Sequence, residues 1–228
     1  MGSSSLTQSQ RLIQTDRWEL SCDTRLLLRL YPDSVYAQTE ITFGLTTNKG
    51  TIGLTPSLIK TTSREVDEQY TALFGKKTGT RCVRHLEHCL FFEENGIEWN
   101  LHLRECADGL AFRYDLPSST PFKILKENTQ IHCPTAAKVC TLPYTTWYEE
   151  TRIIETAANL PRGAYGLPTL VYSDAEENYL ISESDIDGSN CGAHLVWIDD
   201  CFTFTLADEE ILTDSRFASP WRVFVIGS

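Results

Sequence analysis

Two cysteines and two histidines lie close together in the sequence, at Cys82, His85, His88 and Cys89. Thiolate and imidazole groups are the ligands that zinc prefers in tetrahedral protein sites. In an extended strand, however, positions 82 and 88 share one face while positions 85 and 89 point away. The four groups converge only on a helix or a bend, and we therefore favour a structural role for them over a zinc site.

A second group of candidate ligands carries hard oxygen donors and begins at Glu183. Asp185 and Asp187 follow at alternate positions before Gly188, as at the opening of a calcium-binding loop. The twelfth position holds His194 in place of the bidentate glutamate that closes an EF-hand. An EF-hand is therefore excluded, and a solvated acidic turn is the default interpretation. The turn can still lend one carboxylate to a cation whose other ligands come from elsewhere.

Signatures of a complete catalytic centre are absent from the sequence. It contains no Gly-x-Ser-x-Gly motif and no glycine-rich phosphate loop. Hydrolysis of a glycoside needs two carboxylates that face each other across the scissile bond. The chain has 31 acidic residues, but their spacing singles out no such pair, so we predict no catalytic residue in it.

Composition excludes several classes of partner. The formal net charge is -11, which repels a phosphate backbone, and we expect no nucleic-acid partner. No stretch approaches the roughly 20 apolar residues of a membrane span, so we expect no membrane partner. The amino terminus also lacks the basic and then apolar layout of a secretory signal.

The eight cysteines are spread over a chain that is large enough to fold by packing alone. Buried reduced thiols are therefore the favoured interpretation. Disulfides between Cys82 and Cys89 and between Cys133 and Cys140 remain the alternative for an exported protein.

The elements that must position all these groups follow a period of two. Apolar residues alternate with polar residues from Ile97 to Leu103, which puts one apolar row on one face of a strand. Segments 35–43, 110–114 and 202–206 alternate in the same way, and segments 26–28, 179–181 and 223–226 are apolar on both sides. The second group is typical of central strands that are covered on both faces.

Turn residues separate these runs where antiparallel neighbours require them. Asn95 and Gly96 tolerate the positive φ angles of a type I′ hairpin turn. Asp108 and Gly109 form another turn, which delivers Arg113 to the face opposite the aromatic residues of the next run. We expect Arg113 to pair with an acid as a strut between loops.

Many short strands with frequent turns predict an all-β fold, a large antiparallel β-sandwich with at most one or two short helices. We expect a disordered segment over residues 1–15 and one domain over residues 16–228. One helix is predicted after a capping box at Thr62 and Glu65, with Val66, Tyr70, Leu73 and Phe74 at helical spacing.

Several phrases of the sequence resemble the amino-terminal domain of glycoside hydrolase family 97, in the order in which that domain has them. The most specific is residues 104–114, which resembles the signature Arg-x-x-x-Asp-Gly-x-Ala-Phe-Arg-Tyr. The others are residues 51–58, 127–131, 147–149, 179–185 and 219–223. Together they cover nearly the whole chain after its first fifteen or so residues.

The resemblance implies a β-supersandwich, similar to galactose mutarotase, that packs against a catalytic (β/α)8 barrel. It also implies a calcium ion shared with the barrel, to which this domain contributes one glutamate, and by position that glutamate is Glu183. Such an ion would polarise the scissile glycosidic oxygen. Glu149, beside Trp147, is a weaker candidate for the surface that faces an oligosaccharide substrate.

The chain also departs from the family pattern. It ends at Ser228, whereas a (β/α)8 barrel needs about 250 residues. We therefore expect a domain that is inactive alone, either a fragment of a longer gene product or a free-standing relic, with the barrel supplied in cis or in trans. Family members are usually periplasmic or secreted, yet this sequence shows no signal peptide.

The leading hypothesis is a domain of an α-glucosidase-like or α-galactosidase-like enzyme that shapes the sugar site and donates a calcium ligand. The second is a stand-alone carbohydrate-binding or protein-interaction module that exposes Trp147, Tyr148 and Trp197. The third is a mutarotase-like sugar epimerase, ranked last because the five histidines are scattered.

Overall fold

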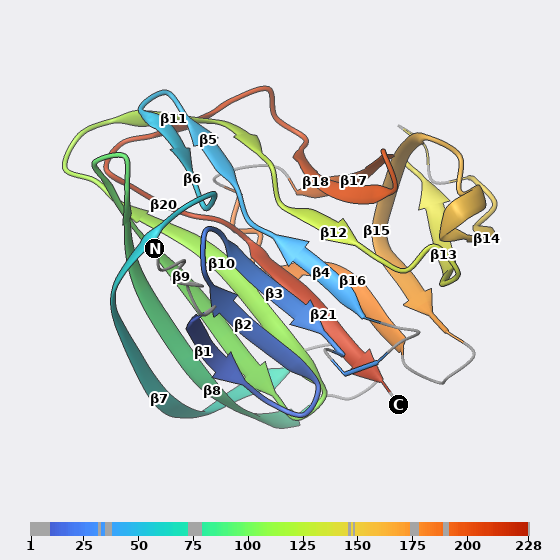
Figure 1. Ribbon diagram of the computed structural model, residues 1–228, viewed down its shortest axis with the longest axis horizontal. Coiled ribbons are helices and arrows are strands. Elements are labelled where there is room, and N and C mark those ends of the chain that lie inside the picture. The colour runs from blue at the N-terminus through green and yellow to red at the C-terminus, as the bar shows by residue number, and fades with distance from the viewer. Residues whose placement is uncertain are drawn as a thin grey trace, which may run out of the picture.

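The computed structural model describes residues 10–31, 33–34, 38–72, 79–145, 147, 149–173, 178–188 and 192–227. Antiparallel strands make up most of this part of the chain (Figure 1). A single 3-10 turn, Ala157–Asn159, is the one helical element among the described residues. The predicted all-β class with at most one or two short helices is therefore confirmed. In the same part of the chain, no helix has the length and apolar character needed to cross a membrane.

The main sheet folds over into two layers that share strand β15 (Gly163–Tyr172). The first layer runs in the spatial order β7 (Ser57–Ala72), β8 (Gly79–Glu94), β9 (Ile97–Cys106), β10 (Gly109–Pro117), β21 (Trp221–Gly227), β16 (Asn178–Ser184) and β15. The second runs β1 (Gln10–Gln14), β2 (Trp18–Cys22), β3 (Leu26–Leu30), β4 (Thr39–Thr42), β12 (Gln130–His132), β18 (Cys201–Leu206), β17 (Ala193–Ile198) and β15.

Shorter strands extend this framework. Strands β13 (Lys138–Pro143) and β14 (Ile153–Thr156) continue outward from β15, and β20 (Arg216–Ala218) pairs with β10. A separate four-stranded sheet joins β6 (Gly50–Ile52), β5 (Leu45–Thr47), β11 (Phe122–Glu127) and β19 (Ile211–Thr213). These elements matter for function because β11 brings a buried acid toward β21.

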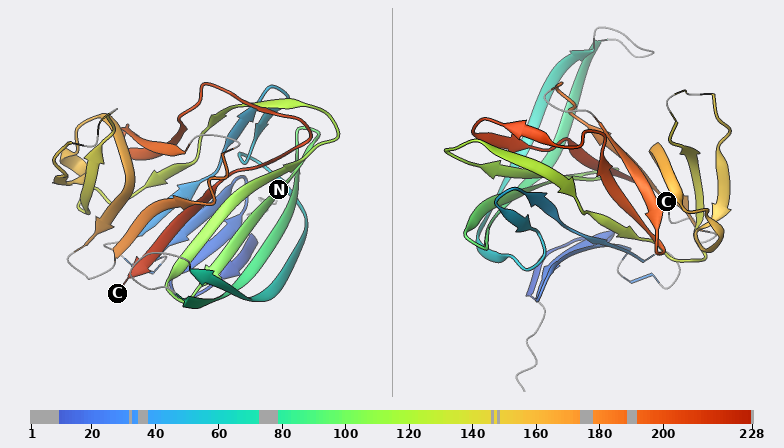
Figure 2. Two further views of the ribbon diagram at one scale, coloured as in Figure 1. Left: turned by 180° about the vertical axis from the view of Figure 1, so that it is seen from behind. Right: turned by 90° about the horizontal axis from the view of Figure 1, so that it is seen from above.

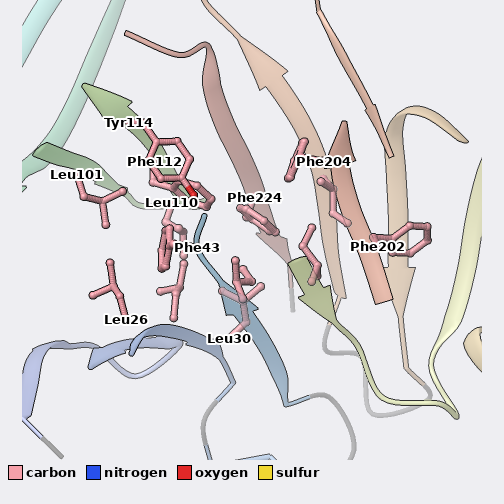
Figure 3. Close-up of a cluster of buried hydrophobic side chains, with 14 of the residues drawn as sticks. Leu26, Leu30, Phe43, Leu101, Leu110, Phe112, Tyr114, Phe202, Phe204 and Phe224 are labelled. Atoms are coloured by element: carbon pink, nitrogen blue, oxygen red, sulfur yellow. The ribbon is translucent and has the colours of Figure 1, made fainter. Parts of the chain in front are cut away.

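The core lies between the two layers (Figure 3). Phe112 of the first layer contacts Phe43 at a ring-centroid distance of 5.0 Å and Phe224 at 6.0 Å. Leu26 and Leu30 face these rings from the second layer, and both are fully buried. The predicted period of two is confirmed, because Leu101 and its alternate neighbours on β9 are buried while the residues between them are not.

The predicted hairpin at Asn95 and Gly96 is also confirmed. Both residues have positive φ, 55° and 78°, and they connect β8 to β9. Phe92 and Trp99, which pair directly across the two strands, stack at 4.8 Å. A turn that needs positive φ thus sets the register that brings two large aromatic side chains together.

The predicted helix after Thr62 is wrong. Residues from Ser57 to Ala72 form β7, which pairs with β8 along its whole length, and the end of β7 and the start of β8 extend beyond the rest of the sheet (Figure 2). Val66 and Tyr70 are four residues apart, a spacing that puts two side chains on one face of a helix but also on one face of a strand. The other two residues of the helical pattern, Leu73 and Phe74, lie outside the described residues.

The amino-terminal part differs from expectation at one point. Residues 10–14, which we predicted to be disordered, form β1 and pair with β2. Leu12 and Ile13 pack against the core, and Arg11 forms an ion pair with Glu19 at 2.8 Å, which explains the order. Residues 1–9 lie outside the described residues.

Candidate functional site

The predicted metal ligand Glu183 lies near the end of β16, opposite Arg222 of β21. Its side chain is 12% exposed, so the carboxylate reaches the rim of the sandwich without lying free in solvent. Arg222 Nη1 donates a hydrogen bond to Glu183 Oε2 at 2.9 Å. The backbone N–H of Ala193 donates to both carboxylate oxygens, at 3.1 and 3.0 Å. Two donors from different strands therefore fix the carboxylate.

Arg222 is itself held from behind by Glu127 of β11. Both side chains are completely buried. Arg222 Nε donates to Glu127 Oε1 at 3.1 Å, and Nη2 donates to Oε2, so the contact is bidentate. Burial alone would lower the pKa of Arg222, but the Glu127 carboxylate raises it above the usual arginine range. Arg222 is therefore a permanent cation between two carboxylates.

Gly192 leaves the space in which the Glu183 carboxylate lies. A Cβ atom at position 192 would stand 2.5 Å from Glu183 Oε1. Any other residue at position 192 would push the carboxylate away or distort the start of β17. We call these three residues the Glu183 cradle: Arg222 gives a charged donor, Ala193 gives a backbone donor, and Gly192 leaves room for the carboxylate.

The cradle suits a single oxygen ligand for a hard cation. An ionised carboxylate has about four lone-pair positions, and Oε1 accepts a hydrogen bond from Ala193 alone among the described residues. Calcium prefers carboxylate oxygens, so Glu183 fits as one of its ligands. Within the described ranges, however, no three His, Cys, Asp or Glu side chains are grouped so that they could hold a metal ion. The remaining ligands of a calcium ion would have to come from another domain.

The turn after Glu183 contacts β10 through Arg113, which belongs to the family-like segment 104–114. Arg113 Nη1 donates to Asp185 Oδ2 at 3.1 Å, which confirms the predicted strut. The guanidinium groups of Arg104 and Arg113 lie over the Trp221 ring, at 4.2 and 4.5 Å from its centroid. The most specific sequence motif therefore contains an arginine that contacts the turn after Glu183.

Asp115, a carboxylate that the sequence analysis did not single out, lies on the same face of β10 as Arg113. Asp115 accepts hydrogen bonds from Arg216 Nε at 2.7 Å, Asn100 Nδ2 at 3.1 Å and His102 Nε2 at 3.2 Å. Burial on its own would raise the pKa of Asp115, but these contacts hold it far below the usual aspartate range. No sequence signal marks the cluster, because its four members come from three strands and meet only through pairing.

The candidate zinc ligands do not form a site. They lie along β8, where alternate residues point to opposite faces, as predicted. His88 Nδ1 is 2.8 Å from the Ser63 hydroxyl. Burial raises the pKa of Cys89 to about 11, so it is a thiol at neutral pH.

All the described cysteines carry free thiols, as the favoured interpretation predicts, but only Cys22, Cys133 and Cys201 are buried, and Cys82 is exposed. The described cysteines are Cys22, Cys82, Cys89, Cys106, Cys133, Cys140 and Cys201. Neither of the two disulfides left open by the sequence is formed, and Cys191 lies outside the described residues.

The weaker candidates for a sugar-facing surface lie in the connection between β13 and β14. Trp147 is 58% exposed, and its indole N–H donates to Glu150 at 3.1 Å. Glu149 is exposed as well. In the same connection, Tyr144 stacks on His194 at 4.3 Å, with the ring planes 9° apart. Since His194 follows Ala193, which donates to Glu183, this connection lies at the same end of the fold as the Glu183 cradle.

The other aromatic candidates contribute less to that surface. Trp197 is 3% exposed and packs in the core at 4.6 Å from Phe202, so the prediction that it is exposed is wrong. Its place on β17 explains the error, because every second residue of that strand faces inward. Tyr148 lies outside the described residues.

The chain is similar in sequence to a known protein family and to one named relative. The family described as Glycosyl-hydrolase 97 N-terminal matches residues 30–228. A protein of Streptomyces bingchenggensis (strain BCW-1) named "Probable retaining alpha-galactosidase" is 30% identical over 167 residues, which are 72% of this chain and 26% of that protein. The chain thus spans about a quarter of the length of this relative.

Solved structures show the same fold. A variant of a glycoside hydrolase family 97 enzyme from Pseudoalteromonas sp. strain K8 superposes with a TM-score of 0.80 at 15% identity, over 95% of this chain and 35% of the enzyme. A beta-arabinopyranosidase superposes with a TM-score of 0.78 at 19% identity, over 92% of this chain and 38% of that protein. The fold is therefore one part of longer enzymes. With the family match over most of its length, the chain belongs to glycoside hydrolase family 97, as its amino-terminal domain.

Proposed function

We propose that this chain shapes the sugar site of an α-glycosidase and supplies one calcium ligand, while a (β/α)8 domain, in cis or in trans, carries the catalytic carboxylates. The observation that supports this most is the Glu183 cradle, in which a carboxylate is fixed at the rim of the sandwich by Arg222 and Ala193. Nothing else within the described ranges completes a metal site, so the carboxylate suits an ion held between two domains. When bound, calcium would polarise the glycosidic oxygen.

The catalytic half of the proposal predicts that the chain alone is inactive. The 228-residue protein, incubated with aryl α-glucosides and α-galactosides with and without calcium, should release no phenol above the buffer rate. Activity that disappears on one Glu→Gln substitution within the chain would contradict the proposal, because hydrolysis would then need only groups that it contains.

The calcium half can be tested in a chimera. Residues 10–228, which include β1, would replace the matching amino-terminal part of the Streptomyces relative, and calcium affinity would be measured by isothermal titration. We expect Glu183→Gln to weaken calcium binding by at least roughly 10- to 100-fold, because loss of a residue that only supports a metal ligand already has an effect of this size. Glu210→Gln, at an exposed acid that pairs with Lys123, is the matched control. Equal affinity in both variants would remove Glu183 from the site.

A carbohydrate surface around Trp147 and Glu149 is part of the same proposal. Exposed aromatic rings and carboxylates are the groups that contact sugar faces and hydroxyls. They lie in the connection whose Tyr144 stacks on His194, next to Ala193 of the Glu183 cradle, and this favours a role in holding substrate over a role in an independent module. Titration of the isolated chain with malto-oligosaccharides, followed by tryptophan fluorescence, separates the two. Saturable binding by the chain alone, lost in Trp147→Ala, would favour the module.

A further inference from the structure

The interior of the sandwich contains an ionic network that is unusual for a β-core. Arg222 and Glu127 are each completely buried, and the third member, Glu183, is 12% exposed. Buried charges are rare in protein cores unless they are paired, because desolvation opposes them. The three come from β21, β11 and β16, so the network connects three separate strands.

The contacts of the network are directional. Glu127 takes two of the guanidinium nitrogens of Arg222, Nε and Nη2. The third nitrogen, Nη1, is thereby aimed at Glu183 Oε2. A planar guanidinium held at two points cannot rotate, which fixes the direction of its remaining donor. Glu127 therefore orients Arg222, and Arg222 orients Glu183.

The opposite side of the carboxylate is defined by Gly192 and Ala193. The Ala193 N–H donates to both Glu183 oxygens, and Oε1 occupies space that a side chain at position 192 would fill. The carboxylate is thus held between the Arg222 guanidinium and the start of β17. Its remaining lone pairs face away from these donors.

We infer that Arg222, supported by Glu127, and Gly192 are positioning residues that hold the Glu183 carboxylate in one orientation before a cation arrives. This inference rests on the proposed calcium role of Glu183. Positioning of this kind lowers the cost of ordering the ligand when the ion binds. Arg222 and Gly192 would supply no ligand atom to the ion, and both would act through Glu183.

The Ala193 amide gives a direct readout in the 228-residue chain without metal. Arg222→Lys keeps the charge but loses the fork that contacts two carboxylates, and Gly192→Ala displaces Oε1. Both should move the amide signal of Ala193 in NMR spectra and speed its hydrogen exchange about tenfold, as loss of one hydrogen bond does. Thermal unfolding, followed in parallel, confirms that each variant is folded.

Two matched controls exist in the chain. Arg216→Lys changes an arginine that pairs with Asp115 on the outer face. Gly163→Ala adds a Cβ whose nearest neighbour, the Tyr165 hydroxyl, is 4.0 Å away. Both should leave the Ala193 amide unchanged. An unchanged amide in folded Gly192→Ala would overturn the inference, even if Arg222→Lys failed to fold.

Calcium affinity in the chimera gives the second readout. We expect Gly192→Ala and Arg222→Lys to weaken calcium binding by roughly 10-fold or more, with no change in the two controls. If Glu183→Gln weakens binding and Gly192→Ala does not, the inference is wrong while the calcium role stands. If Glu183→Gln itself has no effect, the calcium role fails and the inference fails with it. A shifted Ala193 amide would then show only that Arg222 and Gly192 orient the Glu183 carboxylate.

Discussion

Replacing Glu127 by glutamine should be among the most destabilising conservative changes in this protein. The substitution keeps the size of the side chain and leaves no cavity, so its effect reports the lost charge. It leaves Arg222, which is completely buried, with Glu183 as its one carboxylate partner among the described residues. Removal of one partner from a buried pair typically costs about 3–5 kcal/mol. A domain of this size has a total stability of roughly 5–15 kcal/mol, so the loss is large.

The structure also predicts how much stability other variants of the same ionic network should lose. Glu183→Gln should cost less, about 1.5–3 kcal/mol, because Arg222 keeps its bidentate contact with Glu127 and the carboxylate at position 183 is partly exposed. The double variant Glu127→Leu with Arg222→Met should recover most of the loss, because apolar residues that replace a buried ion pair are often neutral or stabilising.

Urea denaturation, followed by tryptophan fluorescence and circular dichroism, measures these differences. Glu127→Gln should also lower the melting temperature by roughly 6–20 °C, from the usual shift per kcal/mol at this size. A Glu127→Gln variant as stable as the parent would refute the reasoning. So would a double variant less stable than Glu127→Gln, because removing the unpaired cation should help.

Three further changes test other parts of the fold. Asp115 has a pKa far below its usual value, so its contribution to the free energy of unfolding is complete above about pH 4 and is lost as the pH falls through its folded-state pKa. We therefore expect Asp115→Asn to flatten the acidic part of a profile of urea midpoint against pH, measured from pH 7 to pH 2. Gly109→Ala places a Cβ 2.1 Å from the Phe224 carbonyl oxygen and should cost at least about 1–3 kcal/mol, against no loss in Gly163→Ala, by thermal unfolding. Asn95→Ala puts a less tolerant residue at a φ of 55° and should cost about 1 kcal/mol in the same assay, while an unchanged melting temperature would mean that the turn relaxes.

The sequence predicted those parts of the fold in which one local rule decides the structure. Alternation on β9 and the Asn95-Gly96 turn are rules of this kind, and both are confirmed. The helix prediction failed where two rules gave different answers for the same residues. Val66 and Tyr70 satisfy helical and strand spacing equally, and pairing with β8 along fifteen positions decides in favour of the strand.

The candidate site also has features that the sequence could predict and features that it could not. The Arg113 strut could be predicted, because the turn at Asp108 and Gly109 sets the face to which its side chain points. Glu183 is selected because its phrase resembles the family, and its calcium role stays a prediction. The contact between Glu127 and Arg222 could not be predicted, although both lie in such phrases, since they are 95 positions apart and meet only when β11 and β21 come together. Gly192 gives no signal in the sequence, because its importance depends on a side chain nine residues earlier.

The ionic network is difficult to explain by stability alone. A buried arginine–glutamate pair is seldom better than two apolar side chains of similar volume, so an apolar pair at positions 127 and 222 would serve the core equally well. It would, however, leave Glu183 with the Ala193 N–H as its one remaining donor among the described contacts. The double variant Glu127→Leu with Arg222→Met therefore separates the two roles: it should keep the stability of the parent while the Ala193 amide loses its protection. Loss of both together would mean that the network is needed for folding, and the argument that it exists to orient Glu183 would then fail.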